Sequence, residues 1–291
     1  MNENIIEIKE LRKSFKNKHV LNNLSLAVPK GSVYGLLAKN GEGKTTLIKC
    51  VLGLLKPQSG NIAVLSDNPW NFKEATKEKL GYVPQSDRLY PWLTVRELIN
   101  YTASFYSHWN ETLVEKLIKE WGVNKDDKVG LLSEGQAQKV SIILSVGHEP
   151  ELLIFDEPVA SLDPSARRQF LKTILEILSD RECTIFFSTH ITSDLERVAD
   201  RVAILKSGTI AFSGELDSLK EEVKRLRIYT ERPLVDFKLD GLIHCELSNK
   251  EAIVSIRGFN PELKSYIEKT RNAKVQVEDL NLEEIFLEIT R

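Results

Sequence analysis

The sequence lacks the features that mark several large classes of protein. It has 3 cysteines, 1 methionine and a formal net charge of −2 in 291 residues. No apolar run reaches the roughly 18 residues that suggest a transmembrane helix, and the start, MNENIIEIKE, has no long apolar core of the kind found in secretory signals. Neither the first 224 residues nor the remainder is basic, so the charge does not suggest a large nucleic-acid-binding face.

The cysteines also exclude a metal or redox motif. Cys50, Cys183 and Cys245 lie far apart and match no such spacing. We interpret all three as reduced, structural residues of a cytoplasmic protein. A composition of 42% hydrophobic and 28% charged residues is typical of an ordinary globular protein. The length suits one large domain, or a domain with a smaller companion.

The most informative stretch runs from Val33 to Thr46, VYGLLAKNGEGKTT. It reads as a buried strand, a glycine-rich turn and the start of a helix, which together gather backbone N–H groups around a phosphate. Apolar residues at helical spacing predict that this helix continues to Pro57. In the pattern G-x-x-x-x-G-K-[ST], Lys44 reaches the terminal phosphates and the Thr45 hydroxyl binds Mg²⁺. Ala38 stands where the pattern has glycine. The methyl group costs roughly 1–2 kcal/mol if φ is positive at Ala38, and almost nothing if φ is negative.

Polar residues follow other predicted strands. The apolar run LLIFDEP ends at Asp156 and Glu157, and TIFFSTH ends at His190. Ligands of open α/β sheets bind at the carboxyl ends of the strands, so these side chains are candidates for metal binding, base catalysis and phosphate contact. Paired acids are sometimes only solvated loop residues, and a lone histidine is usually structural. Gln85, which ends a strand at 80–85, would by itself be a surface residue.

Helix signals occupy the region between Gln85 and residue 180. Residues 92–121 form a helical insertion, and Ser133 with Gln136 matches a capping box. That helix start is either an ordinary one or a second phosphate-facing N-terminus. Asp163 and Pro164 predict an N-cap and first turn for a helix reaching about residue 179.

The two ends of the chain differ in character. Residues 5–28 look like short strands, and Phe15 between them is either a structural aromatic or a ring that stacks on adenine. Residues 202–214 match a β-hairpin that turns at Ser207 and Gly208. After a charged helix or linker at 215–224, short strands and two helices form a small β/α appendage without a catalytic constellation.

Taken together, these motifs resemble those of the ATP-binding cassette (ABC) ATPase subunits over about residues 1–218. The matching motifs, in order, are the phosphate loop AKNGEGKTT, the Q-loop Gln85, the LSEGQ signature ending at Gln136, LLIFDEP, the SLD loop ending at Asp163, and STH ending at His190. The resemblance implies an α/β fold of the P-loop NTPase class, with a mixed sheet core, an antiparallel β subdomain and a helical subdomain at about 86–148. The implied ATPase domain spans residues 1–220. A small accessory domain at 225–291 resembles the C-terminal extensions of bacterial exporters of antibiotics, drugs and peptides.

The resemblance also assigns roles to individual residues. The implied catalytic residues are Glu157 as general base, His190, Lys44 and Gln85. The implied nucleotide-binding residues are Phe15, Ala38, Lys39, Asn40, Gly41, Glu42, Gly43, Lys44, Thr45, Thr46, Ser133, Gly135 and Gln136. The implied Mg²⁺ ligands are Thr45, Gln85 and Asp156. A head-to-tail dimer is implied, in which each ATP lies between the phosphate loop of one subunit and the signature helix of the other.

The expected function is ATP hydrolysis that powers transport, in the first place export, by separate membrane subunits, with the chain itself peripheral on the cytoplasmic face of the cell membrane. The aromatic-rich segment after Gln85, DRLYPWLTVRELINYTASFY, is the expected docking face for a coupling helix of those subunits. The alternative for about half of its aromatic residues is packing in the core of the helical subdomain.

Three alternatives stay open: an importer ATPase, a non-transport ABC protein acting on DNA or ribosomes, and a regulatory partner in a heterodimer. The short stretch between Gln85 and Ser133 leaves no room for the long coiled coil of a chromosome ATPase, and no nucleic-acid partner is expected. The transported substrate, the choice between homodimer and heterodimer, and the role of residues 225–291 stay open.

Glu134 is a second departure from the family pattern, since it replaces the first glycine of the signature pair. In the implied dimer its carboxylate faces the partner's γ-phosphate. At a separation of about 8 Å, the repulsion per unit charge is about 0.5 kcal/mol at a dielectric constant of 80 and about 2 kcal/mol at 20. We therefore expect an active ATPase whose dimer closes slowly.

Overall fold

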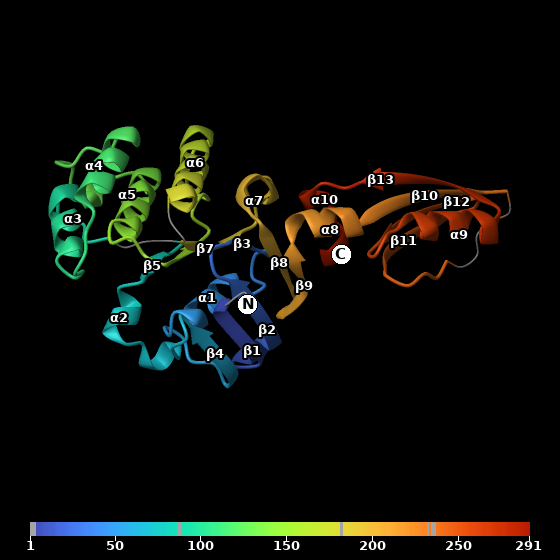
Figure 1. Ribbon diagram of the computed structural model, residues 1–291, viewed down its shortest axis with the longest axis horizontal. Coiled ribbons are helices and arrows are strands. Elements are labelled where there is room, and N and C mark those ends of the chain that lie inside the picture. Colours follow the sequence, from blue (N-terminus) through green and yellow to red (C-terminus); the bar gives the residue numbers. More distant parts are fainter. Residues whose placement is uncertain (1–3, 86–88, 181–182, 232, 234–236) are drawn as a thin grey trace. The chain divides into compact units, whose positions relative to one another are not determined.

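The structure, a computed structural model, describes residues 4–85, 89–180, 183–231, 233 and 237–291, without the side chains of 177–180. The chain divides into two compact units, Met1–Ser213 and Gly214–Arg291. Figure 1 labels most of their helices and strands. Within the described residues, no helix has the length and apolar character needed to cross a membrane.

The first unit opens with a three-stranded antiparallel sheet in the order β2-β1-β4. Its strands are β1 (Asn4–Phe15), β2 (Lys18–Pro29) and β4 (Ser59–Val64). In β2 the buried residues Leu24, Leu26 and Val28 alternate with exposed ones. This period of two is typical of a strand with one buried face, and it confirms the strands expected at 5–28.

The second sheet of this unit has six strands in the order β5-β6-β7-β3-β8-β9. They are β3 (Val33–Leu37), β5 (Leu80–Val83), β6 (Leu152–Asp156), β7 (Thr184–Thr189), β8 (Arg201–Lys206) and β9 (Thr209–Glu215). The four pairs from β5 to β8 are parallel. All residues of β3, β6 and β7 are buried, as expected for parallel strands covered on both faces. Their carboxyl ends therefore meet at one edge of the sheet.

Helices connect these strands. They are α1 (Lys44–Val51), α2 (Glu74–Lys77), α3 (Val95–Ala103), α4 (Glu111–Glu120), α5 (Glu134–Val146), α6 (Pro164–Asp180) and α7 (Thr192–Val198), with 3₁₀ turns at Pro69–Asn71 and Val129–Leu131. The helical insertion expected at 92–121 is two helices, α3 and α4, which lie close to α5. The capping box at Ser133 is confirmed, and Asp163 Oδ1 accepts bonds from the amides of Ser165 and Ala166. These bonds hold the pKa of the Asp163 carboxyl below its usual range.

One helix end differs from expectation. The helix after the phosphate loop was expected to continue to Pro57, but α1 ends at Val51. The physical reason is Gly53, which adopts a φ of +69° and whose N–H bonds to the carbonyl of Cys50 at 3.1 Å. A glycine in the left-handed region stops a helix because it turns the chain away from the helix axis.

The second unit is built on a four-stranded antiparallel sheet in the order β11-β12-β10-β13. Its elements are α8 (Leu216–Glu222), β10 (Lys224–Thr230), β11 (Leu242–Ser248), β12 (Glu251–Ile256), α9 (Pro261–Arg271), β13 (Ala273–Asp279) and α10 (Leu282–Thr290). The core combines residues of the sheet and α9, including Leu226, Val254 and Ile267. Arg225 donates to the buried carboxylate of Glu288 at 3.0 Å, which ties β10 to α10.

Candidate nucleotide-binding site

The phosphate loop joins β3 to α1, and its two glycines need their backbone freedom. Gly41 and Gly43 adopt φ values of +83° and +107°, a region that residues with a side chain rarely enter. At Gly43 a Cβ would also lie 2.9 Å from Cγ1 of Val20. The loop leads directly into the N-terminus of α1 at Lys44, and a helix N-terminus favours anions.

Ala38 is compatible with this loop. It is fully buried and is not among the described residues with positive φ. The steric penalty that a positive φ would impose therefore does not arise. The carbonyl of Ala38 accepts a hydrogen bond from Nζ of Lys44 at 2.8 Å, so the loop fixes its own lysine.

Three of the expected catalytic side chains form one cluster. Nζ of Lys44 lies 3.0 Å from Oε1 of Glu157, and Nδ1 of His190 lies 2.8 Å from Oε2 of the same carboxylate. The side chains of Lys44 and Glu157 are 7% and 4% exposed, whereas that of His190 is 45% exposed. The contact to a carboxylate places the ring proton of His190 on Nδ1. Its Nε2 can therefore make a further contact on the solvent-exposed side of the ring.

Ser188 holds the paired acids and was not assigned a role from the sequence. Its hydroxyl donates to Oδ1 of Asp156 at 2.7 Å and accepts from the amide of Glu157 at 3.2 Å. The pairing of β6 with β7 brings Ser188 opposite Asp156. The only signal in the sequence was its place two residues before His190, and that spacing does not reveal which carboxylate it contacts.

Asp156 is suited to bind a cation. Its side chain is fully buried, and Oδ2 has no hydrogen-bond partner among the described residues. No group of three or more His, Cys, Asp and Glu side chains in the described part of the chain is arranged to hold a metal. The donors expected here are different: one carboxylate, the Thr45 hydroxyl and the Gln85 amide oxygen, all oxygens of the kind that Mg²⁺ prefers. The unpartnered oxygen of Asp156 fits this set.

A cleft of about 340 Å³ gathers most of the expected residues. It is lined by Phe15, Val20, Asn40, Gly41, Gly43, Lys44, Thr45, Thr46, Gln85 and Glu157. Val20, on β2, was missed because nothing in the local sequence distinguishes it from other strand residues. Three expected residues of the same loop do not line the cleft: Ala38, Lys39 and Glu42. His190 contacts the cleft-lining Glu157 directly, and Ser188 links Asp156 to Glu157.

Phe15 forms one wall of the cleft at the end of β1. Its side chain is 46% exposed, and Nζ of Lys13 lies 5.1 Å from the centre of its ring. A partly exposed aromatic ring beside a phosphate loop can stack on a nucleotide base. The position therefore favours the stacking interpretation over a structural one.

The signature residues do not line this cleft. Ser133 and Gln136 satisfy each other through the capping box, and Gly135 lies within the first turn of α5. Glu134 is exposed and lines a separate groove of about 690 Å³, together with Gln85 and Trp92. Within one chain, Ser133, Gly135 and Gln136 are thus not brought to the phosphate loop.

Arg167 was also missed from the sequence. Its Nε donates to the carbonyls of Val159 and Leu162, both at 3.2 Å. These carbonyls flank the turn that follows Glu157, so Arg167 holds the SLD loop in place from α6. A basic residue on a helix gives no sign in the sequence that it binds backbone carbonyls.

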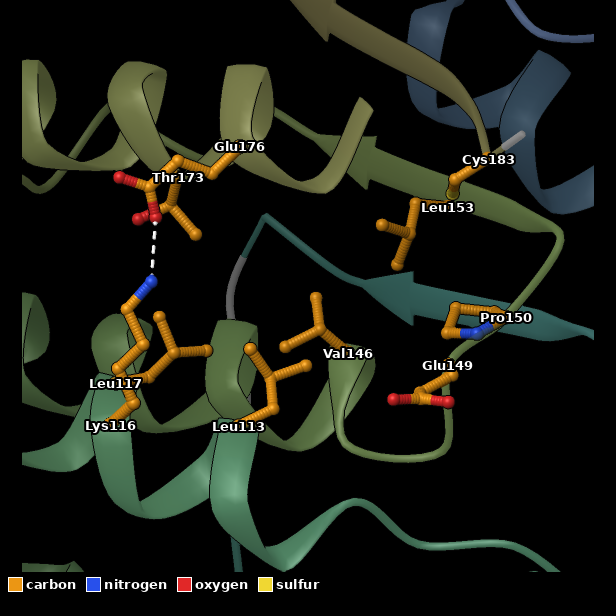
Figure 2. Close-up of a pocket in the computed structure, with 10 residues that line it drawn as sticks. All are labelled: Leu113, Lys116, Leu117, Val146, Glu149, Pro150, Leu153, Thr173, Glu176 and Cys183. Atoms are coloured by element: carbon orange, nitrogen blue, oxygen red, sulfur yellow. Dashed lines mark hydrogen bonds and ion pairs between the residues drawn. The ribbon is translucent and has the colours of Figure 1, made fainter. Parts of the chain in front are cut away.

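A second cavity has no chemistry of this kind. A pocket of about 60 Å³ lies between α4, α5 and α6. Figure 2 shows Leu117, Val146 and Leu153 among the residues that line it. Lys116 and Glu176 form an ion pair at its rim, 3.0 Å apart. None of its ten lining residues is an expected nucleotide-binding or catalytic residue.

Comparison with known proteins places this site in a family. The sequence model of the ABC transporter family matches residues 21–160. The chain is 33% identical over 234 residues to the bacitracin transport ATP-binding protein BcrA of Bacillus licheniformis, covering 80% of this chain and 76% of that one. It is 30% identical over 300 residues to the Nod factor export ATP-binding protein I of Bradyrhizobium diazoefficiens, covering 100% and 97%.

Solved structures agree with the fold. An ATP-binding subunit of an ABC transporter superposes with a TM-score of 0.68 at 30% identity, covering 75% of this chain and 92% of that chain. A dimeric ATP-binding cassette in a post-hydrolysis state, bound to ADP and phosphate, gives a TM-score of 0.66 at 20% identity, covering 72% and 98%. At that identity the likeness concerns the fold alone. The expected fold class is confirmed.

Proposed function

The chain belongs to the ABC transporter family of ATP-binding proteins, and we propose that it powers export through separate membrane subunits. It is an ABC ATPase, and ATP is its nucleotide. The cluster of Lys44, Glu157 and His190 beside the phosphate loop supports the ATP hydrolysis in this proposal. Phosphoryl transfer needs mainly positioning and charge stabilisation, and this cluster supplies a cation, a base and a proton-bearing ring at one place. The similarity to a bacitracin transport and a Nod factor export ATP-binding protein supports export.

ATP binding in this proposal begins by rearranging Lys44. The amides of the phosphate loop and the N-terminus of α1 receive the phosphates, while Phe15 stacks on the base. The Lys44 ammonium, which also donates to the carbonyl of Ala38, exchanges Glu157 for phosphate oxygens. A bound Mg²⁺ would neutralise charge that develops on the phosphates, held by Asp156, Thr45 and Gln85.

Glu157 then acts as the general base. Once Lys44 has moved to the phosphates, the Glu157 carboxylate keeps its contact with His190. Its Oε1 is free to accept a proton from the attacking water, as a general base requires. His190 orients the carboxylate through Nδ1 and turns its open side to the γ-phosphate. Ser188 holds both acids in register for this step.

A second copy or a related subunit completes the site. Ser133, Gly135 and Gln136 do not reach the phosphate loop of their own chain, so in the proposed head-to-tail dimer they contact the nucleotide of the partner. The test uses Glu157→Gln to prevent turnover and measures dimerisation with ATP by light scattering. Adding Glu134→Gln should strengthen dimerisation because it removes a charge near the partner's γ-phosphate; equal or weaker dimerisation contradicts the head-to-tail arrangement.

The docking surface proposed for a membrane subunit is aromatic and was expected after Gln85. Its first members, Asp87 and Arg88, lie outside the described residues. Beyond them, Tyr90 contacts Trp92 and Tyr101, and Tyr101 contacts Phe105, with ring centres 5.0–5.5 Å apart. Trp92 and Phe105 are 67% and 64% exposed. Large exposed apolar groups of this kind mark interaction sites.

The surface gives a direct test of transport. The chain is isolated with its membrane partner after mild detergent extraction, and the partner is identified by mass spectrometry. Trp92→Ala with Phe105→Ala should release the partner while the purified chain keeps its ATPase rate. Leu175→Ala, a change at a 48% exposed residue on α6, serves as the matched control. Failure to recover any membrane protein contradicts the transport proposal. Reconstitution of the complex in vesicles then distinguishes export from import.

For residues 225–291 we propose an accessory domain that acts on the dimer, either by reinforcing it or by regulating it. This region has its own sheet and core. Deletion of residues 225–291, followed by measurement of both dimerisation and ATPase rate, separates the two roles. Reinforcement predicts that both fall together. Regulation predicts a changed rate in a dimer of unchanged stability.

A further inference from the structure

Glu42 places a carboxylate inside the phosphate loop, between the two glycines with positive φ. Such a charge repels a nucleotide phosphate unless it is directed elsewhere. In the structure it is directed elsewhere, since Oε2 of Glu42 accepts a hydrogen bond from the amide of Ser207 at 2.5 Å. The two residues are 165 positions apart in the chain.

Ser207 belongs to the turn between β8 and β9. Ser207 and Gly208 have φ values of +50° and +75°, as two-residue hairpin turns require. Gly208 is buried against β2: a Cβ there would lie 2.6 Å from the carbonyl of Val20, and its own carbonyl accepts from the amide of Asn22 at 2.8 Å. The turn is therefore fixed to the strand that forms one side of the nucleotide cleft.

Val20 connects the same strand to the phosphate loop. It lines the cleft, and its Cγ1 is the atom nearest to a Cβ built on Gly43. The phosphate loop thus packs against β2 at Gly43, and at Glu42 it is hydrogen-bonded to the Ser207–Gly208 turn, which itself packs on β2. Two adjacent loop residues are therefore held, directly or through the turn, by the same strand.

From this geometry, and resting on the proposed function of the cleft, we propose that Glu42 is a positioning residue for the nucleotide. Its carboxylate fastens the phosphate loop to the Ser207–Gly208 turn and so keeps the loop amides directed at the phosphates. It acts through Ser207 and not by contact with ATP. If Glu42 acted only through its charge, its removal would have the opposite effect on nucleotide affinity, because loss of a negative charge beside the phosphates would tighten binding.

Two substitutions separate these roles. Glu42→Gln removes the charge and keeps an oxygen that can accept from Ser207, whereas Glu42→Ala removes both. The probe is ADP with Mg²⁺, which binds without turnover, and the dissociation constant is measured by calorimetry on the full chain. The amide oxygen in Glu42→Gln can still accept a neutral hydrogen bond from Ser207, and such a bond contributes modestly at an exposed site. We therefore expect Glu42→Ala to bind ADP roughly three- to tenfold more weakly than Glu42→Gln. Equal or tighter binding by Glu42→Ala overturns the proposal.

Hydrogen exchange of the Ser207 amide distinguishes the loss of this one contact from a general loss of stability, which would also affect amides elsewhere in the fold. We expect this amide to be protected in the wild type and in Glu42→Gln and to exchange faster in Glu42→Ala, while the amides of β3 keep their protection. Weaker ADP binding without a change at Ser207 overturns the proposal. A wild-type chain that binds ADP and hydrolyses ATP while these variants behave alike overturns this inference alone. A wild-type chain that binds no ADP overturns the proposed function, and this inference with it.

Discussion

The ammonium of Lys44 lies 3.0 Å from Oε1 of Glu157, and both side chains are buried. The residue that should hold the phosphates and the residue that should activate water thus form an ion pair with each other. An unpaired charge at either buried position would lower the stability of the fold, because a buried charge loses its hydration. The pair therefore accounts for how two groups with separate tasks can be kept charged in one buried site.

Glu157→Gln should reduce the ATPase rate of the purified chain by a factor of about 10²–10⁴, because the amide cannot accept the proton of the attacking water. Steady-state phosphate release measures this. Glu176→Gln is the matched control, since Glu176 pairs with Lys116 at the rim of another pocket; its rate should stay near that of the wild type. An unchanged rate in Glu157→Gln contradicts the assignment of the base.

Lys44→Met and Glu157→Gln should each lower the free energy of unfolding in the absence of nucleotide. Breaking a buried ion pair costs about 3–5 kcal/mol. The lower end is expected here because the remaining partner keeps another contact in each variant: Glu157 with His190, or Lys44 with the carbonyl of Ala38. The double variant should lose clearly less than the sum of the two losses. Urea denaturation of all four proteins gives the coupling energy, and simple additivity would show that the two residues do not interact.

Phe15→Ala should weaken nucleotide binding by about 1–3 kcal/mol, the value found for base–aromatic stacking. The loss should be similar for ATP and GTP, since stacking on a ring does not depend on which base is present. Competition with a fluorescent nucleotide measures both affinities. A loss confined to ATP would instead indicate a specific contact to adenine, and Phe105→Ala serves as a control at an exposed ring outside the cleft.

Ala38→Gly should restore the family pattern without speeding hydrolysis. Ala38 is buried and is not among the described residues with positive φ, so glycine relieves no strain. It adds flexibility to the unfolded chain, and the free energy of unfolding should fall by roughly 0.5–1 kcal/mol. Denaturation and ATPase measurements on the same preparation test both statements, and a faster enzyme would show that the methyl group does obstruct the loop.

Cys50, on the buried side of α1, should make stability fall at high pH. Burial raises the pKa of its thiol from 9.0 to about 11. The folded state keeps the proton that the unfolded state releases above pH 9, so its contribution is complete below pH 9 and is lost as the pH rises towards 11. Wild-type protein should therefore lose more stability between pH 8 and 11 than Cys50→Ala. Parallel pH profiles of the two proteins, measured by urea denaturation, would contradict this.

The sequence by itself determined most elements of the cassette and predicted most of the residues that line the cleft beside the phosphate loop. Glycine spacing defines the phosphate loop, apolar runs define the buried strands, and Ser133 and Asp163 define helix starts, because each of these signals acts within a few residues. The end of α1 was placed too far along the chain, because Gly53 had not been recognised as a helix stop. Local physical chemistry therefore accounts for most of the secondary structure, although β4 and α7 were not predicted.

Only the tertiary structure decided which of these groups meet. The contacts of Glu157 with Lys44 and His190, of Ser188 with Asp156, and of Glu42 with Ser207 join residues that are distant in the chain. Such contacts depend on the order and register of parallel strands, which no local pattern specifies. The backbone angle at Ala38 and the place of Val20 in the cleft are decided in the same way, by the packing of separate strands against the phosphate loop.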